Sequence, residues 1–321
     1  MNLLRHNDRA WLLRVLAGGL VAMLGLARSH AADAILVLKS RDLPQYSQAV
    51  NGFLKHWSDT GSTLRVQQKL LSSPTADARS VLGGDQQPRA VVAVGTEAAK
   101  WAIHHTTGPV VFCMIANARQ NLVADLSEAD ARRVRGVSLD IPAHARLRAL
   151  SVYVTKVKRV GVVYDPAKSG ASIEELEEAA AVMGMRLIKQ EVTRDSSLPE
   201  AIHRLAPQID VLWAPVDSTV FNARSAQFVL VQMLERKVPV LGFSENMVKA
   251  GALLALQVDY AVCGEQTAQL LQAVLQDQAP AEWKIQPPRR YTVQINGHVQ
   301  RLLGNPIPPA ALQEVHFIDE E

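Results

Sequence analysis

Short apolar runs alternate with segments of helical periodicity along the chain from residue 34 onward. Apolar strands that alternate with amphipathic helices predict parallel sheets covered by helices on both faces. Strands are predicted at residues 34–39, 64–70, 90–94, 109–115, 134–139, 159–164, 186–192, 211–214, 238–241 and 253–258. Helices are predicted at residues 43–58, 75–82, 96–105, 142–154, 172–183, 198–205, 220–235, 244–248 and 261–276.

This succession of strands and helices occurs twice along the chain, before and after residue 139. It predicts an α/β protein with two doubly wound parallel-sheet lobes. Ligands of such sheets bind beyond the carboxyl ends of the strands, and two lobes can turn those ends toward each other across a cleft. Pro280, Pro287 and Pro288 then interrupt the helical pattern, and a late strand at 291–295 and a short helix at 297–303 follow.

Residues 1–31 are typical of a secretory signal peptide. Arginines precede the uncharged apolar stretch 15–26, which is too short to span a bilayer because a span needs roughly 20 residues. Small residues at Ser29 and Ala31 favour cleavage after Ala31, and a cut after Ala34 also fits. No cysteine lies near this point, so we expect a periplasmic protein that is not a lipoprotein.

The charge of the chain depends on this segment. The whole chain carries a net charge of +3, and residues 1–31 carry four arginines and one aspartate. The remainder is therefore neutral, with as many basic as acidic residues. A neutral chain without a basic cluster gives no reason to expect a nucleic-acid or membrane-surface partner.

Signatures of catalysis are absent from the sequence. It has no GxSxG elbow, Walker loop, HExxH or CxxC motif. His104 and His105 lie at a predicted helix end, where imidazoles cap carbonyl groups, and Cys113 lies inside an apolar strand. We expect no enzyme activity, no cofactor and no metal site. Whether Cys113 and Cys263 pair stays open.

Polar residues gather instead where the predicted strands end, and they are the candidate ligand-binding set. Each of these residues also suits a turn or a helix cap. For any single residue, a role in a turn or a cap is favoured over a role in ligand binding. For the whole set a shared cleft is favoured, and we expect the Asp217 carboxylate to be hydrated and available there. The set comprises Ser40, Gln45, Gly95, Thr96, Glu97, Asn117, Asp165, Asp217, Ser218 and Glu245.

Several segments occur in an order that resembles a known family. They are VGTEAA at 94–99, RGVS at 135–138, KRVGVVYDP at 158–166, DVLWAPVDSTV at 210–220, VPVLGFSENMVKAGALLALQVDY at 238–260 and INGHVQRLLG at 295–304. Together they resemble the ABC-transporter substrate-binding protein family of the tryptophan/tyrosine-binding type, across nearly the whole chain after residue 31.

The resemblance implies a type I periplasmic-binding fold, with two lobes joined by a three-stranded hinge. Lobe 1 would comprise residues 32–138 and 260–280, and lobe 2 residues 139–259 and 281–321. The chain departs from the family pattern at Glu97, at 116–118, at Asp217-Ser218 and at Ser244-Glu245. All of these positions follow predicted strands, so the scaffold matches the family better than the cleft does.

The function that follows is capture of a small polar, amino-acid-like ligand by lobe closure and its delivery to an ABC permease in the inner membrane. A ligand carboxylate would bind the helix N-terminus at Thr96, and Asp217, or less directly Glu245, would pair with an ammonium group. Glu97 favours a cationic or zwitterionic ligand over a dianion. We expect a monomer.

Two alternatives stay open at this point. The two lobes could serve a membrane signalling or secretion system as a sensing or structural module, without transport. A hydrolase or transferase on the same scaffold would need a nucleophile–base pair or a metal set, and the sequence shows neither.

Overall fold

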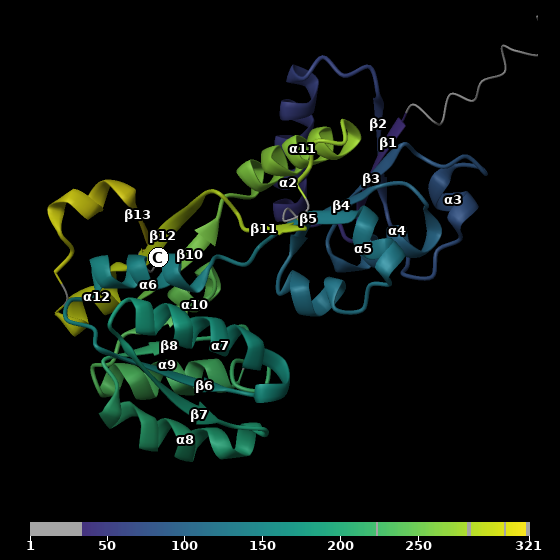
Figure 1. The fold of residues 1–321 in the computed structure, drawn as a ribbon. Coiled ribbons are helices and arrows are strands. Elements are labelled where there is room, and N and C mark those ends of the chain that lie inside the picture. Colours follow the sequence, from purple (N-terminus) through teal and green to yellow (C-terminus); the bar gives the residue numbers. More distant parts are fainter. Residues whose placement is uncertain (1–33, 223, 281–283, 305, 319–321) are drawn as a thin grey trace, which may run out of the picture.

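The structure is a computed structural model that describes residues 34–318, apart from residues 223, 281–283 and 305. The predicted signal peptide, residues 1–31, lies outside the described residues. Two α/β lobes, each built on its own sheet, make up the described chain (Figure 1). Over the described ranges, no helix combines the length and apolar character needed to cross a membrane.

Lobe 1 is built on a six-stranded parallel sheet of order β11-β5-β4-β3-β1-β2. Its strands are β1 (Ala34–Lys39), β2 (Arg65–Leu70), β3 (Ala90–Val94), β4 (Val110–Ile115), β5 (Val134–Ser138) and β11 (Ile285–Gln286). Its helices are α2 (Pro44–Asp59), α3 (Ala78–Leu82), α4 (Thr96–His105), the π-helical turn η1 (Arg119–Val123), α5 (Glu128–Arg133) and α11 (Tyr260–Leu275). One core holds Phe53 of α2 and Leu271 of α11, and a second core holds Trp101 of α4. Both faces of the sheet are thus covered.

Lobe 2 is built on a seven-stranded sheet of order β13-β12-β10-β9-β8-β6-β7. Its strands are β6 (Arg159–Tyr164), β7 (Arg186–Glu191), β8 (Val211–Trp213), β9 (Val240–Gly242), β10 (Leu254–Val258), β12 (Tyr291–Asn296) and β13 (Val315–Ile318). Its helices are α6 (Ala143–Tyr153), α7 (Pro166–Val182), α8 (Leu198–Leu205), α9 (Ser225–Glu235), α10 (Glu245–Lys249) and α12 (Gly297–Leu303), with the 3₁₀ turns η2 (Asp195–Ser197), η3 (Ala206–Gln208) and η4 (Pro309–Glu314). Only the β10–β12 pair is antiparallel among the strand pairs of the described residues.

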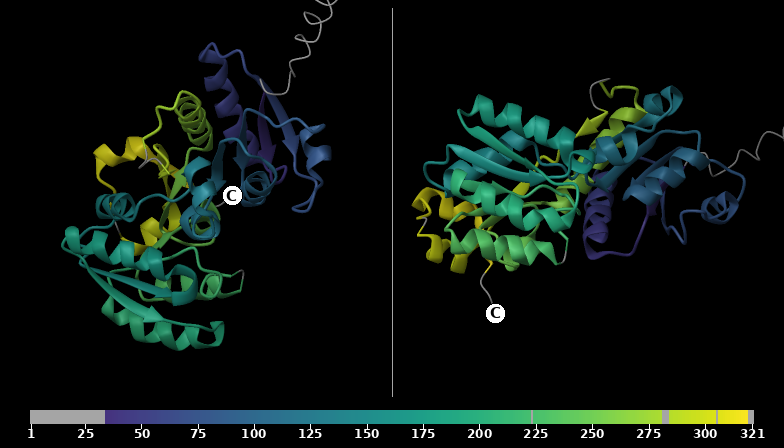
Figure 2. Two further views of the ribbon diagram at one scale, coloured as in Figure 1. Left: turned by 45° about the vertical axis from the view of Figure 1, so that its right-hand side comes forward. Right: turned by 90° about the horizontal axis from the view of Figure 1, so that it is seen from below.

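The chain passes between the lobes where β5 leads to α6, where β10 leads to α11, and where β11 leads to β12. Figure 2 shows the two lobes and these connections from two further sides. Ile141, on the first connection, packs against cores of both lobes. The prediction of two doubly wound lobes is confirmed. The resemblance placed residues 281–321 in lobe 2. In the structure, β11 at Ile285–Gln286 still pairs with β5 of lobe 1, so the chain crosses to lobe 2 after β11.

Helix α2 packs against α11 with the two backbones in direct contact. A Cβ atom on Gly264 would lie 1.8 Å from the carbonyl oxygen of Ala49, and one on Gly52 would lie 2.0 Å from that of Ala261. No side chain fits at either glycine without separating the helices. Because α11 follows directly from β10 of lobe 2, this contact fixes where the first turn of α2 lies relative to the connection between the lobes.

Two helices begin more than three residues away from the start that the periodicity predicts. The helix predicted from residue 172 begins at Pro166, because the Asp165 carboxylate accepts a hydrogen bond from the amide of Ala167 (3.0 Å) and proline suits a first helical turn. The helix predicted from residue 220 begins at Ser225, because Asn222 Oδ1 accepts the Ser225 amide (3.0 Å) and holds the preceding residues in a turn.

Candidate functional site

A cavity of about 430 Å³ lies where the two lobes meet. Residues of α2 in lobe 1, of α10 in lobe 2 and of the connection between β10 and α11 form its walls. Nearly all of them are polar, and they include two residues of the predicted set, one from each lobe. The lining residues are Gln45, Gln48, Ser244, Glu245, Asn246, Gln257, Val258, Asp259 and Tyr260.

Local capping determines which of these side chains are available. Ser244 caps α10 by accepting the amide of Met247 (3.3 Å), which leaves Glu245 on the first turn beside the cavity. Asp259 caps α11 by accepting the amide of Val262 (3.1 Å). Helix α2 begins without a side-chain cap, so the amide of Gln45 in its first turn is not used for capping.

The cavity carries acidic groups. Glu245 and Asp259 are its two carboxylates, and no lysine or arginine is among the lining residues. Glu245 forms an ion pair with Lys249 (2.7 Å) and accepts a longer hydrogen bond from Gln294 (3.4 Å). The hydrogen bond from Lys249 is the main reason why the pKa of Glu245 is lowered below 4.5, so this carboxylate is ionised at neutral pH. The cavity therefore favours a ligand that offers hydrogen-bond donors or a cation.

Two predicted residues of lobe 1, Ser40 and Gly95, build a turn. The buried Ser40 hydroxyl accepts a hydrogen bond from the amide of Ala98 (2.8 Å). Ser40 follows β1, so a residue from a different strand satisfies this amide in the first turn of α4. Gly95 has φ +93°, and a Cβ atom there would lie 2.6 Å from the Tyr46 hydroxyl oxygen. Burial raises the pKa of Tyr46, which keeps its hydroxyl protonated beside this turn. Both predicted residues thus hold the α4 N-terminus in place.

Thr96 and Glu97, which follow in the first turn of α4, are half-buried. Arg41 donates a hydrogen bond to Glu97 (3.2 Å), and the two side chains form an ion pair. The positive charge of Arg41, which follows β1, therefore offsets the negative charge of Glu97, which would otherwise repel an anionic ligand.

Asn117 follows β4 in a turn with φ +49°. Its amide and that of Ala118 donate hydrogen bonds to the carboxylate of Asp140, at 2.7 and 3.2 Å. Burial raises the pKa of Asp140 in spite of these bonds. Asp140, which is not among the predicted residues, thus ties the β4 turn to the first connection between the lobes.

Asp217 is 2% exposed, so the expected hydrated carboxylate is wrong. Its oxygens accept hydrogen bonds from the Asp165 amide (2.7 Å), the Ser169 hydroxyl (2.8 Å) and the Thr219 amide (2.9 Å). The hydroxyl of Thr219 in turn donates to the carboxylate of Asp165 (2.8 Å). The loops after β6 and β8 are joined by this buried network, which explains why the carboxylate faces inward.

Ser218 lies on the surface beside this network and accepts a hydrogen bond from Lys168 (2.9 Å). Of the predicted set, Gln45 and Glu245 both line the cavity, whereas Ser40, Gly95, Asn117, Asp165 and Asp217 hold turns of their own lobes. Roles in ligand binding stay predictions for all ten residues.

The two cysteines are buried free thiols in the core of lobe 1. Burial raises the pKa of both thiols, and that of Cys263 reaches about 12. Neither is therefore a reactive thiolate at neutral pH. Within the described part of the chain, no cluster of three or more His, Cys, Asp or Glu side chains could hold a metal ion.

A second hollow, of about 380 Å³, lies at the amino-terminal end of the lobe 1 strands. Residues before β3 and β4, such as Arg89 and Thr107, line it together with Leu275 at the end of α11. Because these are the amino ends of the strands, this hollow does not face lobe 2.

Comparisons with known proteins agree with this arrangement. Residues 46–313 match the family model described as ABC transporter substrate binding protein. A tyrosine-binding protein of Clostridioides difficile (strain R20291) is 23% identical over 242 residues, which cover 73% of this chain and 70% of that protein.

Solved structures show the same fold. The ligand-free, open structure of a substrate-binding protein with adhesive properties from Clostridium difficile is 20% identical, has a TM-score of 0.71 and covers 90% of this chain and 99% of its own. A structure from Streptococcus pneumonia in complex with L-Trp is 22% identical, has a TM-score of 0.58 and covers 88% of this chain and 98% of its own.

Proposed function

Because this chain belongs to the ABC transporter substrate-binding protein family, whose members bind solutes and are not enzymes, we propose that it captures an amino-acid-like ligand between its lobes. The observation that carries the proposal is the polar cavity to which Gln45 of lobe 1 and Glu245 of lobe 2 both contribute. A ligand that contacts both walls binds the closed arrangement better than the open one and so shifts the population toward closure.

The acidic lining supports a ligand with an ammonium group. Glu245 and Asp259 supply carboxylates, while Gln45, Gln48 and the other amides supply hydrogen-bond donors and acceptors. Relatives described as binding tyrosine or L-Trp support a free amino acid as the ligand class. Delivery would follow when the closed form meets the membrane permease of the transporter.

Export is part of the same proposal. The signal-peptide pattern over residues 1–31 supports a periplasmic location, where a solute-binding protein meets its ligand before the permease does. Cell fractionation with N-terminal sequencing should find the mature protein in the periplasm, starting at or near Ala32. An intact Met1 in the membrane fraction would contradict export.

Thermal melts with each of the proteinogenic amino acids test the binding proposal. A true ligand at about 100 times its Kd should stabilise the protein by about 2.7 kcal/mol and raise the melting temperature. Gln45→Ala should reduce that shift, because the residue lines the cavity, whereas Gln68→Ala, on exposed β2, should not. If no amino acid shifts the melt of the wild type, the proposed ligand class is wrong.

A further inference from the structure

Arg146 lies on the first turn of α6, directly after the first connection between the lobes. Its guanidinium carbon lies 3.9 Å from the centroid of the Trp213 ring, and its Nη2 donates a hydrogen bond to the carbonyl of Gly242 (3.2 Å). Trp213 is the last residue of β8 and Gly242 is the last of β9. The guanidinium therefore lies at the carboxyl edge of the lobe 2 sheet, where the loops that face the cleft begin.

No carboxylate neutralises this cation among the described residues. Elsewhere in the chain Arg133 and Arg159 each contact an aspartate at 2.6 Å, but no ion pair of the described residues includes Arg146. Burial lowers the pKa of Arg146 to about 10, so the group is still charged at neutral pH. A desolvated cation without a counterion is costly, and such groups are concentrated at functional sites.

The surroundings restrict what could neutralise it. A guanidinium presents five N–H donors in one plane and matches the two oxygens of a carboxylate. The guanidinium lies over the Trp213 ring, and the single described hydrogen bond, to Gly242, leaves further donors for a partner. Gly242 is two residues before Ser244, which lines the acidic cavity together with Glu245. The carbonyl that Arg146 contacts thus belongs to the strand that leads into the loop before Glu245.

We propose that Arg146 is the counterion of the ligand carboxylate, so that the cleft recognises a zwitterion by both of its charges. The inference rests on the proposed function and deepens it, because it assigns the carboxylate to lobe 2 and not to the helix N-terminus at Thr96. Arg146 then makes the site specific for free amino acids over the amines that lack the carboxylate.

Calorimetric titration of ligand pairs that differ only in the carboxylate tests this role. L-tryptophan with tryptamine and L-tyrosine with tyramine are such pairs, and the panel extends to any amino acid that raises the melting temperature. Arg146→Gln should weaken amino-acid binding at least 100-fold and leave binding of the amine within about 3-fold. The matched control Arg148→Gln changes an exposed arginine on the same helix and should bind as the wild type does.

A structural role for Arg146 predicts a different pattern. If the residue only ties α6 to β9, Arg146→Gln lowers the melting temperature of the ligand-free protein and weakens the amine and the amino acid equally. That outcome, or unchanged amino-acid affinity, overturns the inference. If Arg146 serves the ligand, the ligand-free variant melts at or above the temperature of the wild type, because a partly buried charge without a counterion among the described residues has been removed.

A second probe separates this inference from the proposed function. The Arg146 Nε–H resonance, identified by its absence in Arg146→Gln, should shift saturably when sodium acetate is titrated at constant ionic strength, with chloride as the control. A shift without any amino-acid binding supports an anion site while the proposed ligand class fails. The absence of a shift overturns the role of Arg146 even if amino acids bind.

Discussion

Asp217 and Glu245 follow neighbouring strands of the lobe 2 sheet, yet their surroundings are opposite. Asp217 is 2% exposed and accepts three hydrogen bonds from its own lobe, whereas the side chain of Glu245 is 42% exposed and lines the cavity. A carboxylate whose lone pairs are already used by neighbouring amides holds a loop in place. One that faces a cavity is available to a ligand. The position at a strand end does not distinguish the two roles, but the hydrogen-bond partners do.

The largest expected effect is on the structural side of this comparison. Asp217→Ala leaves the Asp165 amide, the Ser169 hydroxyl and the Thr219 amide without their acceptor inside a buried network. We expect the free energy of unfolding to fall by about 4 kcal/mol, since each such loss costs about 1–3 kcal/mol. Urea unfolding of the ligand-free protein measures it. A loss below about 1 kcal/mol would mean that the network does not hold the loops.

A similar but smaller loss is expected where α2 meets α11. Gly264→Ala places a methyl group on the Ala49 carbonyl, and overpacking of this kind costs typically 1–3 kcal/mol. Because α2 carries Gln45 and Gln48 into the cavity, ligand affinity should fall as well, although no ligand contact is removed. Gly170→Ala is the control, because its Cβ atom would meet nothing within 4 Å. Equal unfolding curves for the two variants would contradict the close helix contact.

Glu245→Gln sharpens the functional side of the comparison. Removing a charge that pairs with a ligand ammonium should weaken binding about 10-fold, or about 1.4 kcal/mol, while the ligand-free protein loses only a surface pair with Lys249, worth about 0.5 kcal/mol. Calorimetry against the amino acid that raises the melting temperature most measures the first effect. If Glu245→Gln is strongly destabilised but binds the amino acid normally, Glu245 has the structural role that is assigned to Asp217.

The same carboxylate predicts a dependence on pH. Its folded pKa is lowered, chiefly by the hydrogen bond from Lys249, so its contribution to stability is present above the ordinary value of 4.5 and is lost as the pH falls through the folded value. Glu245→Gln should remove this component from the acid limb of the stability curve. Identical acid limbs in wild type and variant would show that the pair with Lys249 contributes nothing.

The smallest effect is expected at the Arg41–Glu97 pair. The side chains of Arg41 and Glu97 are 67% and 38% exposed, and pairs between exposed side chains contribute about 0.2–1 kcal/mol. Arg41→Ala should hardly change unfolding and should leave amino-acid affinity unchanged, because the ligand carboxylate is assigned to Arg146 and not to the α4 N-terminus. Clearly weaker binding in this variant would instead indicate a ligand anion near Thr96, where the charge of Glu97 is then no longer offset.

Most of the fold follows from the alternation of apolar runs with helical segments, because burial on both faces of a parallel sheet leaves that pattern in the sequence. Strand β11 could not be predicted, because it has two residues and precedes two prolines. Strand β13 was also missed. Its side chains are only partly buried, so no clean alternation of apolar and polar residues marks it.

The cavity was less predictable than the fold. Gln48, Asn246 and Tyr260 lie on helices and not at strand ends, so only the packing of two lobes brings them together. The inward orientation of Asp217 depends on donors at Asp165 and Ser169, about 50 positions earlier in the chain. Such long-range pairing leaves no local pattern, whereas Gln45 and Glu245, in the first turns of the helices that follow β1 and β9, belong to the predicted set.

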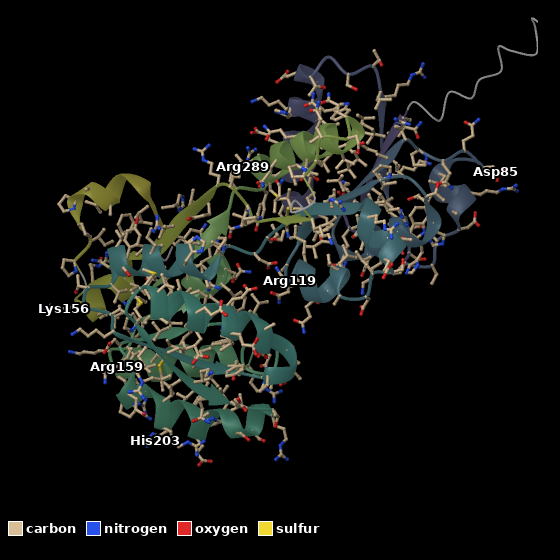
Figure 3. The ribbon with its side chains drawn as sticks, in the orientation of Figure 1. Asp85, Arg119, Lys156, Arg159, His203 and Arg289 are labelled. Atoms are coloured by element: carbon tan, nitrogen blue, oxygen red, sulfur yellow. The ribbon has the colours of Figure 1, made fainter. Side chains whose placement is uncertain are left out.

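Lobe closure is tested most directly by the distance between the two lobes in solution. Figure 3 shows Asp85 and His203 on the outer sides of lobe 1 and lobe 2, and both side chains are exposed. Spin labels on Asp85→Cys and His203→Cys would report that distance by double electron–electron resonance, because the native thiols are buried. We expect a shorter distance once a free amino acid that raises the melting temperature is added, and no shortening in Arg146→Gln at the same concentration. Binding of that amino acid with an unchanged distance would contradict capture by closure.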